Sequence, residues 1–385
     1  MLPLLTQHLL ERFAGTELGD WLSPLRVFRY ITFRSAGAAL TALLLSLWLG
    51  PAFIRWLLRL KFGQDYVDVA GQHGAGSARQ AKVGVPTMGG LLIVTAIDLS
   101  VLLWTQWNAL VVLTLVSLIG LAGLGFYDDW AKLTRARRED RGRGIEARVK
   151  LIVQGVLSLF VGGYLWWAPA TRPLVADLMV PFVKFPLVTG AGALGLVVTV
   201  GTIVGSSNAV NLTDGMDGLA IGCTLIVTLV FLVFTYVAGN LNFAGYLQIP
   251  YVAGAGELTV ICAALFGACL GFLWFNCHPA EVFMGDTGSL ALGGVLGIMA
   301  VLIHQPFVLL IAGGVFVMEA ASVMIQVASS QLSRRFWGRD WRPFRLTPLH
   351  HHFEKLGWPE TKIVTRFYIL SVLFAVLALA TLKLR

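Results

Sequence analysis

The sequence contains few charged residues. Asp, Glu, Lys and Arg make up only 13% of its 385 residues, whereas 57% are hydrophobic and the mean hydropathy is +0.76. A soluble domain is excluded, because a soluble chain of this length carries about twice that share of charged side chains. The chain is therefore expected to be a polytopic membrane protein.

Cysteine is also scarce, and repeats and low-complexity tracts are absent. The four cysteines fall in or beside apolar runs and form no C-x-x-C pair: Cys223, Cys262, Cys269 and Cys277. This spacing argues against a zinc site or a disulfide framework and favours small buried side chains. Because the apolar runs are closely linked, residues 1–385 are expected to form a single integral domain.

The N-terminal segment lacks features of a removable signal peptide. It begins MLPLLTQHLLERFAG, without a basic start or a small-residue cleavage site. Residues 1–34 are expected instead to form an interfacial segment that begins with an amphipathic helix.

Long apolar runs are abundant. A helix needs roughly 20 apolar residues to cross a hydrocarbon core of about 30 Å. Such runs predict an all-α protein with about ten transmembrane helices, near residues 36–56, 87–105, 109–127, 150–167, 186–206, 217–237, 258–275, 287–303, 306–328 and 363–383.

Basic residues are distributed unevenly between the loops. Loops after odd-numbered spans hold most of the 29 lysines and arginines, whereas internal loops after even-numbered spans hold only Arg172 and Lys184. The positive-inside rule therefore predicts that the odd loops are cytoplasmic and that both termini are periplasmic in a Gram-negative cell. This topology and anionic lipid headgroups account for the net charge of +8, so no nucleic-acid partner is expected.

Polar clusters fall at the predicted cytoplasmic ends of the helices. Asp128 and Asp129 end the third span, where a carboxylate opposes the helix dipole. They could simply face solvent, but that unfavourable position indicates a function. Adjacent helical residues point about 100° apart, so we expect one to face a site and the other to be held by a neighbouring basic group.

The stretch NAVNLTDGMDGLA (208–220) precedes the sixth span. Asp214 and Asp217 lie on one helix face if that helix begins there. Helix capping is the alternative, yet one cap needs one carboxylate. It also leaves Asn208 and Asn211 unexplained, so this segment is predicted to bind a ligand.

Asp286 lies in MGDTGS (284–289), before the eighth span. Capping is a serious alternative here, because Asp, Thr and Ser all suit an N-cap position. Asn276 and Thr287 crowd the same region and favour a functional site.

His350, His351 and His352 are consecutive in a basic loop. Consecutive residues rarely converge on one tetrahedral zinc ion, so hydrogen bonds to phosphate or assistance to proton transfer are favoured. Lys82 and Lys150 lie at the cytoplasmic edges of spans, where they either snorkel to the interface or bind an anion.

Asp98 and Glu319 lie inside the second and ninth spans, where ionisable groups are costly. Neither is expected near the cytoplasmic polar cluster, and a buried hydrogen bond between helices would satisfy them. We give both little weight as site residues.

Acids gathered at one membrane surface repel each other and any anionic substrate. A divalent cation would offset this repulsion, and Mg²⁺ is commonly held by one or two carboxylates together with substrate phosphates. Lysines and histidines nearby would complete a phosphate clamp. The sequence therefore predicts a metal-dependent enzyme that acts on a phosphate or diphosphate at the inner leaflet.

These motifs, in this order, resemble those of the phospho-N-acetylmuramoyl-pentapeptide transferases, a branch of the polyprenyl-phosphate N-acetylhexosamine-1-phosphate transferases. The segments that carry the resemblance are PTMGG (86–90), the Asp128–Asp129 pair, NAVNLTDGMDGLA (208–220), FLWFN followed by FMGDTGSLALGG (272–294) and PLHHHFE (348–354). The triple histidine is similar to that of the cell-wall branch, which distinguishes it from relatives that use UDP-N-acetylglucosamine.

The resemblance implies transfer of phospho-MurNAc-pentapeptide from UDP-MurNAc-pentapeptide to undecaprenyl phosphate, giving lipid I and UMP in peptidoglycan biosynthesis. It also implies an Mg²⁺ cofactor, an active-site cleft on the cytoplasmic face of the bacterial inner membrane, a ninth helix that breaks near its cytoplasmic end, and a homodimer.

Site residues follow from the same resemblance. Asp286 matches the Mg²⁺ ligand, and Asp128 and Asp129 match the acidic pair at the lipid phosphate, one of them the proposed base. The remaining catalytic candidates are Asp217, His350 and His351. The substrate-binding candidates are Lys82, Lys150, Asn208, Asn211, Asp214, Asn276 and His352.

Alternatives remain at this stage. A sister enzyme would take a different sugar nucleotide, and a secondary transporter would place its site near the bilayer midplane instead of at one surface. For the transfer itself, direct attack by the lipid phosphate is preferred over a covalent aspartyl intermediate, because a phosphate dianion is already a nucleophile and needs mainly positioning.

Overall fold

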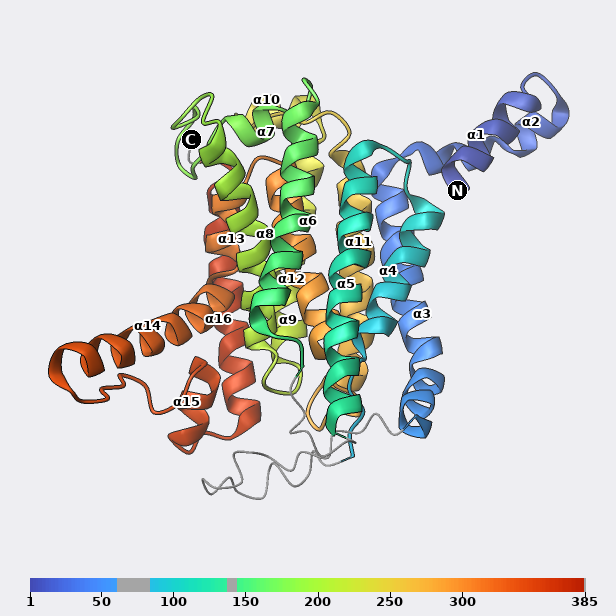
Figure 1. Ribbon diagram of the computed structural model, residues 1–385. Coiled ribbons are helices and arrows are strands. Elements are labelled where there is room, and N and C mark those ends of the chain that lie inside the picture. The colour runs from blue at the N-terminus through green and yellow to red at the C-terminus, as the bar shows by residue number, and fades with distance from the viewer. Residues whose placement is uncertain (61–83, 137–143, 384–385) are drawn as a thin grey trace.

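The computed structural model describes residues 1–60, 84–136 and 144–383, and this part of the chain is almost entirely helical (Figure 1). Nine of its helices are long and apolar enough to cross a membrane, so the chain is a multi-pass membrane protein. The spanning helices are α3 (Ile31–Arg59), α5 (Ala109–Ala136), α6 (Ala147–Trp167), α8 (Ala193–Thr213), α9 (Leu219–Ala238), α11 (Gly256–Asn276), α12 (Gly285–Leu302), α14 (Gly314–Trp337) and α16 (Glu360–Ala380).

Shorter helices complete the fold. The apolar helix α4 (Gly90–Trp104) occupies the predicted second span, and the others are α1 (Leu2–Arg12), α2 (Glu17–Trp21), the 3₁₀ helix η1 (Ser23–Arg29), α7 (Pro173–Ala176), α10 (Leu241–Leu247), α13 (Pro306–Ala312) and α15 (Leu349–Lys355). Within the predicted interfacial segment, α1 and α2 lie beside the bundle, outside the main packing of helices (Figure 1).

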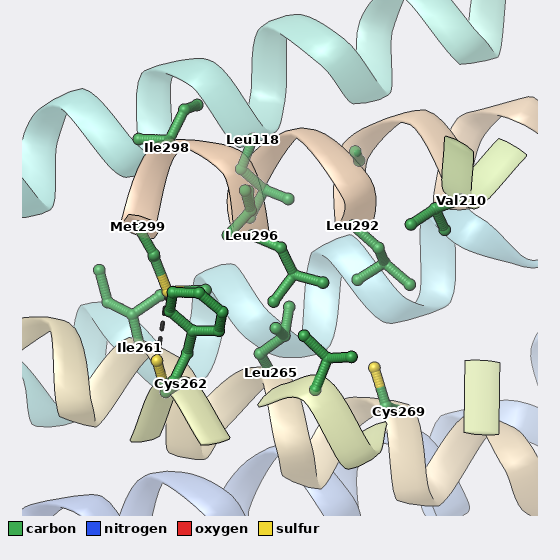
Figure 2. Packing of buried hydrophobic residues seen from close by; sticks show 14 of the residues in the cluster. Leu118, Val210, Ile261, Cys262, Leu265, Cys269, Leu292, Leu296, Ile298 and Met299 are labelled. Atoms are coloured by element: carbon green, nitrogen blue, oxygen red, sulfur yellow. Dashed lines mark hydrogen bonds between the residues drawn. The ribbon is translucent and has the colours of Figure 1, made fainter. Parts of the chain in front are cut away.

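The two helices α11 and α12 form the centre of the bundle. Nearly every residue of α12 is buried, α11 packs on α3 and α9, and α12 packs on α5 and α8. Figure 2 shows side chains of α5, α8, α11 and α12 interlocking between these helices. Cys262 and Cys269 lie among them, which confirms the prediction of small buried side chains; Cys223 is buried too, but Cys277 is exposed.

Two predicted spans differ from the structure. The fifth begins at Ala193 instead of near 186, because Gly190 and Gly192 adopt positive φ before it. The helix then continues to Thr213, through sequence that we predicted to be a loop.

The ninth span is broken, and the break comes at Gly313, between α13 and α14, early in the predicted segment. We expected a break near the cytoplasmic end, which the predicted topology puts at the C-terminal end of this span, and that expectation was wrong. A glycine pair weakens a helix, and the ring of Phe374 lies only 2.6 Å from where a Cβ of Gly314 would be. From this point α14 projects sideways out of the bundle (Figure 1).

The N-terminus contacts the end of α4, the second span, and the C-terminal region contacts α10, which follows the sixth span. The amino group of Met1 donates to the carbonyl of Leu102 at 2.7 Å, and the ammonium of Lys383 lies 3.7 Å from the ring of Tyr246. In Figure 1 both ends are at the upper side with α7 and α10, whereas α15 is at the lower side. An even number of crossings is consistent with this arrangement.

A buried ion pair joins α3 to α11 at that upper side. Arg34 Nη1 and Nη2 lie 2.5 and 2.7 Å from the two carboxylate oxygens of Glu257, and the amide of Gln106 also donates to Glu257 at 2.8 Å. Arg34→Met would leave a buried carboxylate without its cation. We expect this change to destabilise the protein by about 3–5 kcal/mol, measured as thermal unfolding in detergent. The double variant Arg34→Met/Glu257→Leu should recover most of the loss, and a single variant that melts like the wild type would contradict the prediction.

Candidate active site

Three carboxylates from distant parts of the sequence meet at one place. Asp128 and Asp129 lie near the end of α5, and Asp286 lies in the first turn of α12. Their ligand oxygens all lie within 4.8 Å of one another. We call Asp128, Asp129 and Asp286 the carboxylate cluster.

Two lysines neutralise this cluster. Lys132 Nζ lies 2.7 Å from Asp128 Oδ2 and 3.1 Å from Asp286 Oδ2, and Lys150 Nζ lies 2.7 and 2.6 Å from the same two atoms. The amide of Ile145 donates to the other oxygen of Asp128 at 2.6 Å. Lys150 was predicted here as a possible anion-binding residue, whereas Lys132 was not.

Asp286 faces the cluster and does not cap its own helix. Its Oδ1 accepts a hydrogen bond from Asn211 Nδ2 at 2.9 Å, and Asp286 is the second residue of α12, whose N-cap position is Met284. The capping alternative for Asp286 is therefore wrong. Asn211 also donates to Ser289 Oγ at 2.8 Å, which ties the end of α8 to the first turns of α12.

Asp129 accepts hydrogen bonds from the first backbone N–H groups of α12. Its Oδ1 accepts from the amide of Asp286 at 3.1 Å, and its Oδ2 accepts from the amide and hydroxyl of Thr287 at 3.0 and 2.7 Å. We predicted that a basic group would hold one member of the aspartate pair. Lys132 and Lys150 do hold Asp128 in this way. Asp129 is held mainly by free N–H groups at a helix N-terminus, where the helix dipole also favours a negative charge. Gly125 permits the contact, because a Cβ there would lie 2.2 Å from the Asp286 carbonyl oxygen.

Asp214 and Asp217 lie on the loop before α9, which begins only at Leu219. The prediction that they share a helix face was therefore wrong. The two carboxylates also have different surroundings. Burial raises the pKa of Asp214 to about 8, with further upward contributions from the nearby carboxylates of Asp286 and Asp129. Asp214 thus lies beside the carboxylate cluster.

Asp217 belongs to a second group of ligand-type side chains, with His278 and Glu360. Its Oδ2 lies 3.0 Å from His278 Nδ1 and accepts from the amide of Ala280 at 3.2 Å. Glu360, the first residue of α16, accepts from the backbone amide of Asp217 at 2.8 Å. The expectation that Asp217 joins the other acids around one ion is not met in this arrangement.

The predicted asparagines mainly connect loops and helices. Asn208 Nδ2 donates to Gln154 Oε1 at 2.8 Å and to the carbonyl of Val204, and not to an acid of the carboxylate cluster. Asn276 accepts from the amide of Gly218 at 3.2 Å and donates to the carbonyl of Val282 at 2.8 Å, so it fixes the loops on both sides of it. Lys82 lies outside the described residues.

The three histidines of α15 point to three different environments. His350 is fully buried and contacts Glu319. His351 Nδ1 lies 2.9 Å from Glu354 Oε2, and His352 Nδ1 accepts from the amide of Arg345 at 3.1 Å. The sequence analysis predicted that consecutive histidines would not converge on one ion, and their ring nitrogens contact three different residues.

Four polar residues of this region were missed or misplaced by the sequence analysis. Lys132 is four residues after Asp128, a spacing that brings opposite charges together on a helix and could have identified it. Glu319 was expected far from the polar cluster, and its contact with His350 shows that this was wrong. No local pattern in the sequence signals that His278 and Glu360 meet Asp217.

The donor set of the carboxylate cluster suits a hard divalent cation. Its ligand atoms are carboxylate oxygens, which Mg²⁺ prefers over nitrogen or sulfur. Asp129 already accepts three hydrogen bonds from α12, whereas Asp128 and Asp286 present oxygens to the ammonium groups of Lys132 and Lys150. Asp286, with Asp128 beside it, therefore fits a metal-binding role best.

Comparisons with known proteins find similarity over nearly the whole chain. Residues 86–304 match the model of a family described as glycosyl transferase family 4. A phospho-N-acetylmuramoyl-pentapeptide-transferase from Desulfotalea psychrophila is 50% identical over 360 residues, which cover 93% of this chain and 95% of the relative. Proteins of the same name from Methylacidiphilum infernorum and Opitutus terrae are each 47% identical, over 95% and 96% of this chain and 97% and 98% of their own.

Proposed function

This chain belongs to glycosyl transferase family 4, and from that premise we propose that it transfers phospho-N-acetylmuramoyl-pentapeptide from UDP-MurNAc-pentapeptide to undecaprenyl phosphate. The products are lipid I and UMP, as peptidoglycan synthesis requires. One observation carries the proposal: a chain that is 50% identical, over 93% of its length, to a transferase of that name brings together a cluster of acids and lysines suited to a diphosphate. The homodimer implied by the family resemblance is part of the same proposal.

The proposed location is the bacterial cytoplasmic membrane, with the carboxylate cluster at its inner face and both termini on the periplasmic side. The distribution of lysine and arginine between the loops supports this orientation. So does the position of the termini, which lie beside the end of α4 and beside α10. At the inner face a lipid-borne phosphate and a cytosolic nucleotide sugar can reach the same site.

In the proposed reaction, an oxygen of undecaprenyl phosphate attacks the phosphorus that carries the sugar. The bond from this phosphorus to the UMP oxygen breaks, and UMP leaves with the bonding electrons. Lys132 and Lys150 would bind phosphate oxygens and offset the charge that develops on them. Mg²⁺, held by Asp286 with Asp128 beside it, would neutralise charge on the diphosphate when bound.

The surroundings of Asp128 support direct transfer over a covalent aspartyl intermediate. Its side chain is fully buried and is held by Lys132, Lys150 and the amide of Ile145. A carboxylate engaged by three donors is a weak nucleophile toward phosphorus, whereas a phosphate monoester dianion needs mainly to be positioned.

The test is UMP release by the purified protein in detergent with undecaprenyl phosphate, UDP-MurNAc-pentapeptide and Mg²⁺. We expect turnover to stop on addition of EDTA and to return with excess Mg²⁺. UDP-N-acetylglucosamine in place of the MurNAc nucleotide is the matched control for the sister activity, and it should give no UMP. UMP release only from UDP-N-acetylglucosamine would refute the proposed substrate. Turnover that EDTA does not affect would refute the proposed metal.

A further inference from the structure

Glu319 and His350 form a fully buried pair between α14 and α15. Both side chains have 0% exposure. Glu319 Oε1 accepts from the backbone amide of His350 at 3.2 Å, and Oε2 lies 3.2 Å from His350 Nδ1. One carboxylate therefore engages both the backbone and the ring of the same histidine.

These contacts determine which ring nitrogen carries the proton. A carboxylate can only accept hydrogen bonds, so the nitrogen that faces it must be the protonated one. Burial lowers the pKa of His350, which favours the neutral ring. In a neutral ring with a proton on Nδ1, Nε2 is a hydrogen-bond acceptor.

His350 Nε2 points at the aspartate loop before α9. It occupies the space where a Cβ of Gly215 would be, at 2.2 Å from that position, so the loop can approach the ring only because residue 215 is glycine. Nε2 is buried and has no hydrogen-bond partner among the described residues. An unpartnered buried nitrogen of this kind is costly unless another molecule satisfies it.

We propose that Glu319 is a positioning residue that holds His350 with its proton on Nδ1, so that Nε2 accepts a hydrogen bond from a hydroxyl or N–H group of the bound sugar nucleotide once the loop at Gly215 moves aside. This inference rests on the proposed function for the identity of the ligand. The assignment of the tautomer depends only on contacts within the protein.

Glu319→Gln tests the pair with minimal change in shape. His350 presents two donors to two carboxylate oxygens, whereas glutamine offers one oxygen and one NH₂ group. One donor would then lose its acceptor, and the ring should turn or exchange its tautomer. In ¹⁵N-histidine protein, the signals of His350 are assigned by their loss in His350→Gln among the seven histidines. We expect a protonated Nδ1 and an unprotonated Nε2 in the wild type, and altered signals in Glu319→Gln.

Kinetics separate positioning from stability. Glu319→Gln should lower kcat on the order of 10- to 100-fold, as expected for a misplaced catalytic-site group, with a smaller change in KM. In the His350→Gln background the same substitution should have little further effect, because Glu319 acts through His350. Glu257→Gln is the matched control: it neutralises another buried glutamate, paired with Arg34, and should lower thermal stability but leave the His350 signals and kcat unchanged.

Three results would overturn the proposal: a wild-type ring protonated on Nε2, unaltered signals and kcat in Glu319→Gln, or an equal loss of kcat when His350 is already glutamine. A wild-type chain with the expected tautomer that releases no UMP would refute the proposed function and leave the Glu319–His350 assignment supported.

Discussion

Asp286→Asn is expected to reduce UMP release on the order of 10²- to 10³-fold while the protein remains folded. Asparagine keeps the shape of the side chain, and its oxygen can still accept the hydrogen bond from Asn211. It removes the negative charge that faces Lys132 and Lys150 and that would bind the cation. The lower rate of UMP release should therefore reflect lost charge stabilisation in the transition state, and the packing should change little.

The measurement is the rate of UMP release at saturating Mg²⁺, together with the melting temperature of the same preparation. Asp340→Asn is the matched control, because Asp340 is an acid beside Arg334 and Arg342 on the arm formed by α14 and the loop after it, distant from the cluster in sequence. It should retain wild-type turnover. Full activity in Asp286→Asn would contradict the metal assignment.

Most of the fold could be predicted from hydropathy alone, because a spanning helix must satisfy its backbone internally and present apolar side chains over its whole length. All ten predicted spans contain helices. The helix ends were less predictable. Next to the break at Gly313, the ring of Phe374 from α16 packs closely on Gly314, a contact between residues far apart in sequence. The late start of α8 depends on backbone conformations at Gly190 and Gly192.

The convergence of Asp128, Asp129 and Asp286 could be predicted because acids at helix ends need a compensating partner. Their individual roles could not. The three consecutive histidines looked equivalent in sequence, but only His350 is buried against Glu319. That distinction arises from the path of α14 after its break, which brings a residue from the interior of a predicted span next to α15. Side-chain orientation across separate helices leaves no local trace in the sequence.

The division of roles between the adjacent aspartates leads to a second large effect. Asp129→Asn should lower both the melting temperature and the rate of UMP release, because Asp129 accepts the hydrogen bonds of the first turn of α12. Asparagine keeps one acceptor oxygen but replaces the other by an NH₂ group, and a buried donor left without its acceptor costs about 1–3 kcal/mol. The same turn carries Asp286, and a displacement of about 1 Å there can cost on the order of 10²-fold in rate.

Asp128→Asn is the matched comparison, since the carboxylate of Asp128 faces Lys132, Lys150 and the amide of Ile145 and does not contact α12 N–H groups. It should reduce turnover with a smaller change in melting temperature than Asp129→Asn. If Asp129→Asn melts at the wild-type temperature, or if Asp128→Asn is the more destabilised of the two, the assignment of Asp129 to the N-terminus of α12 is incorrect. The structural roles assigned to Asp128 and Asp129 would then have to be exchanged.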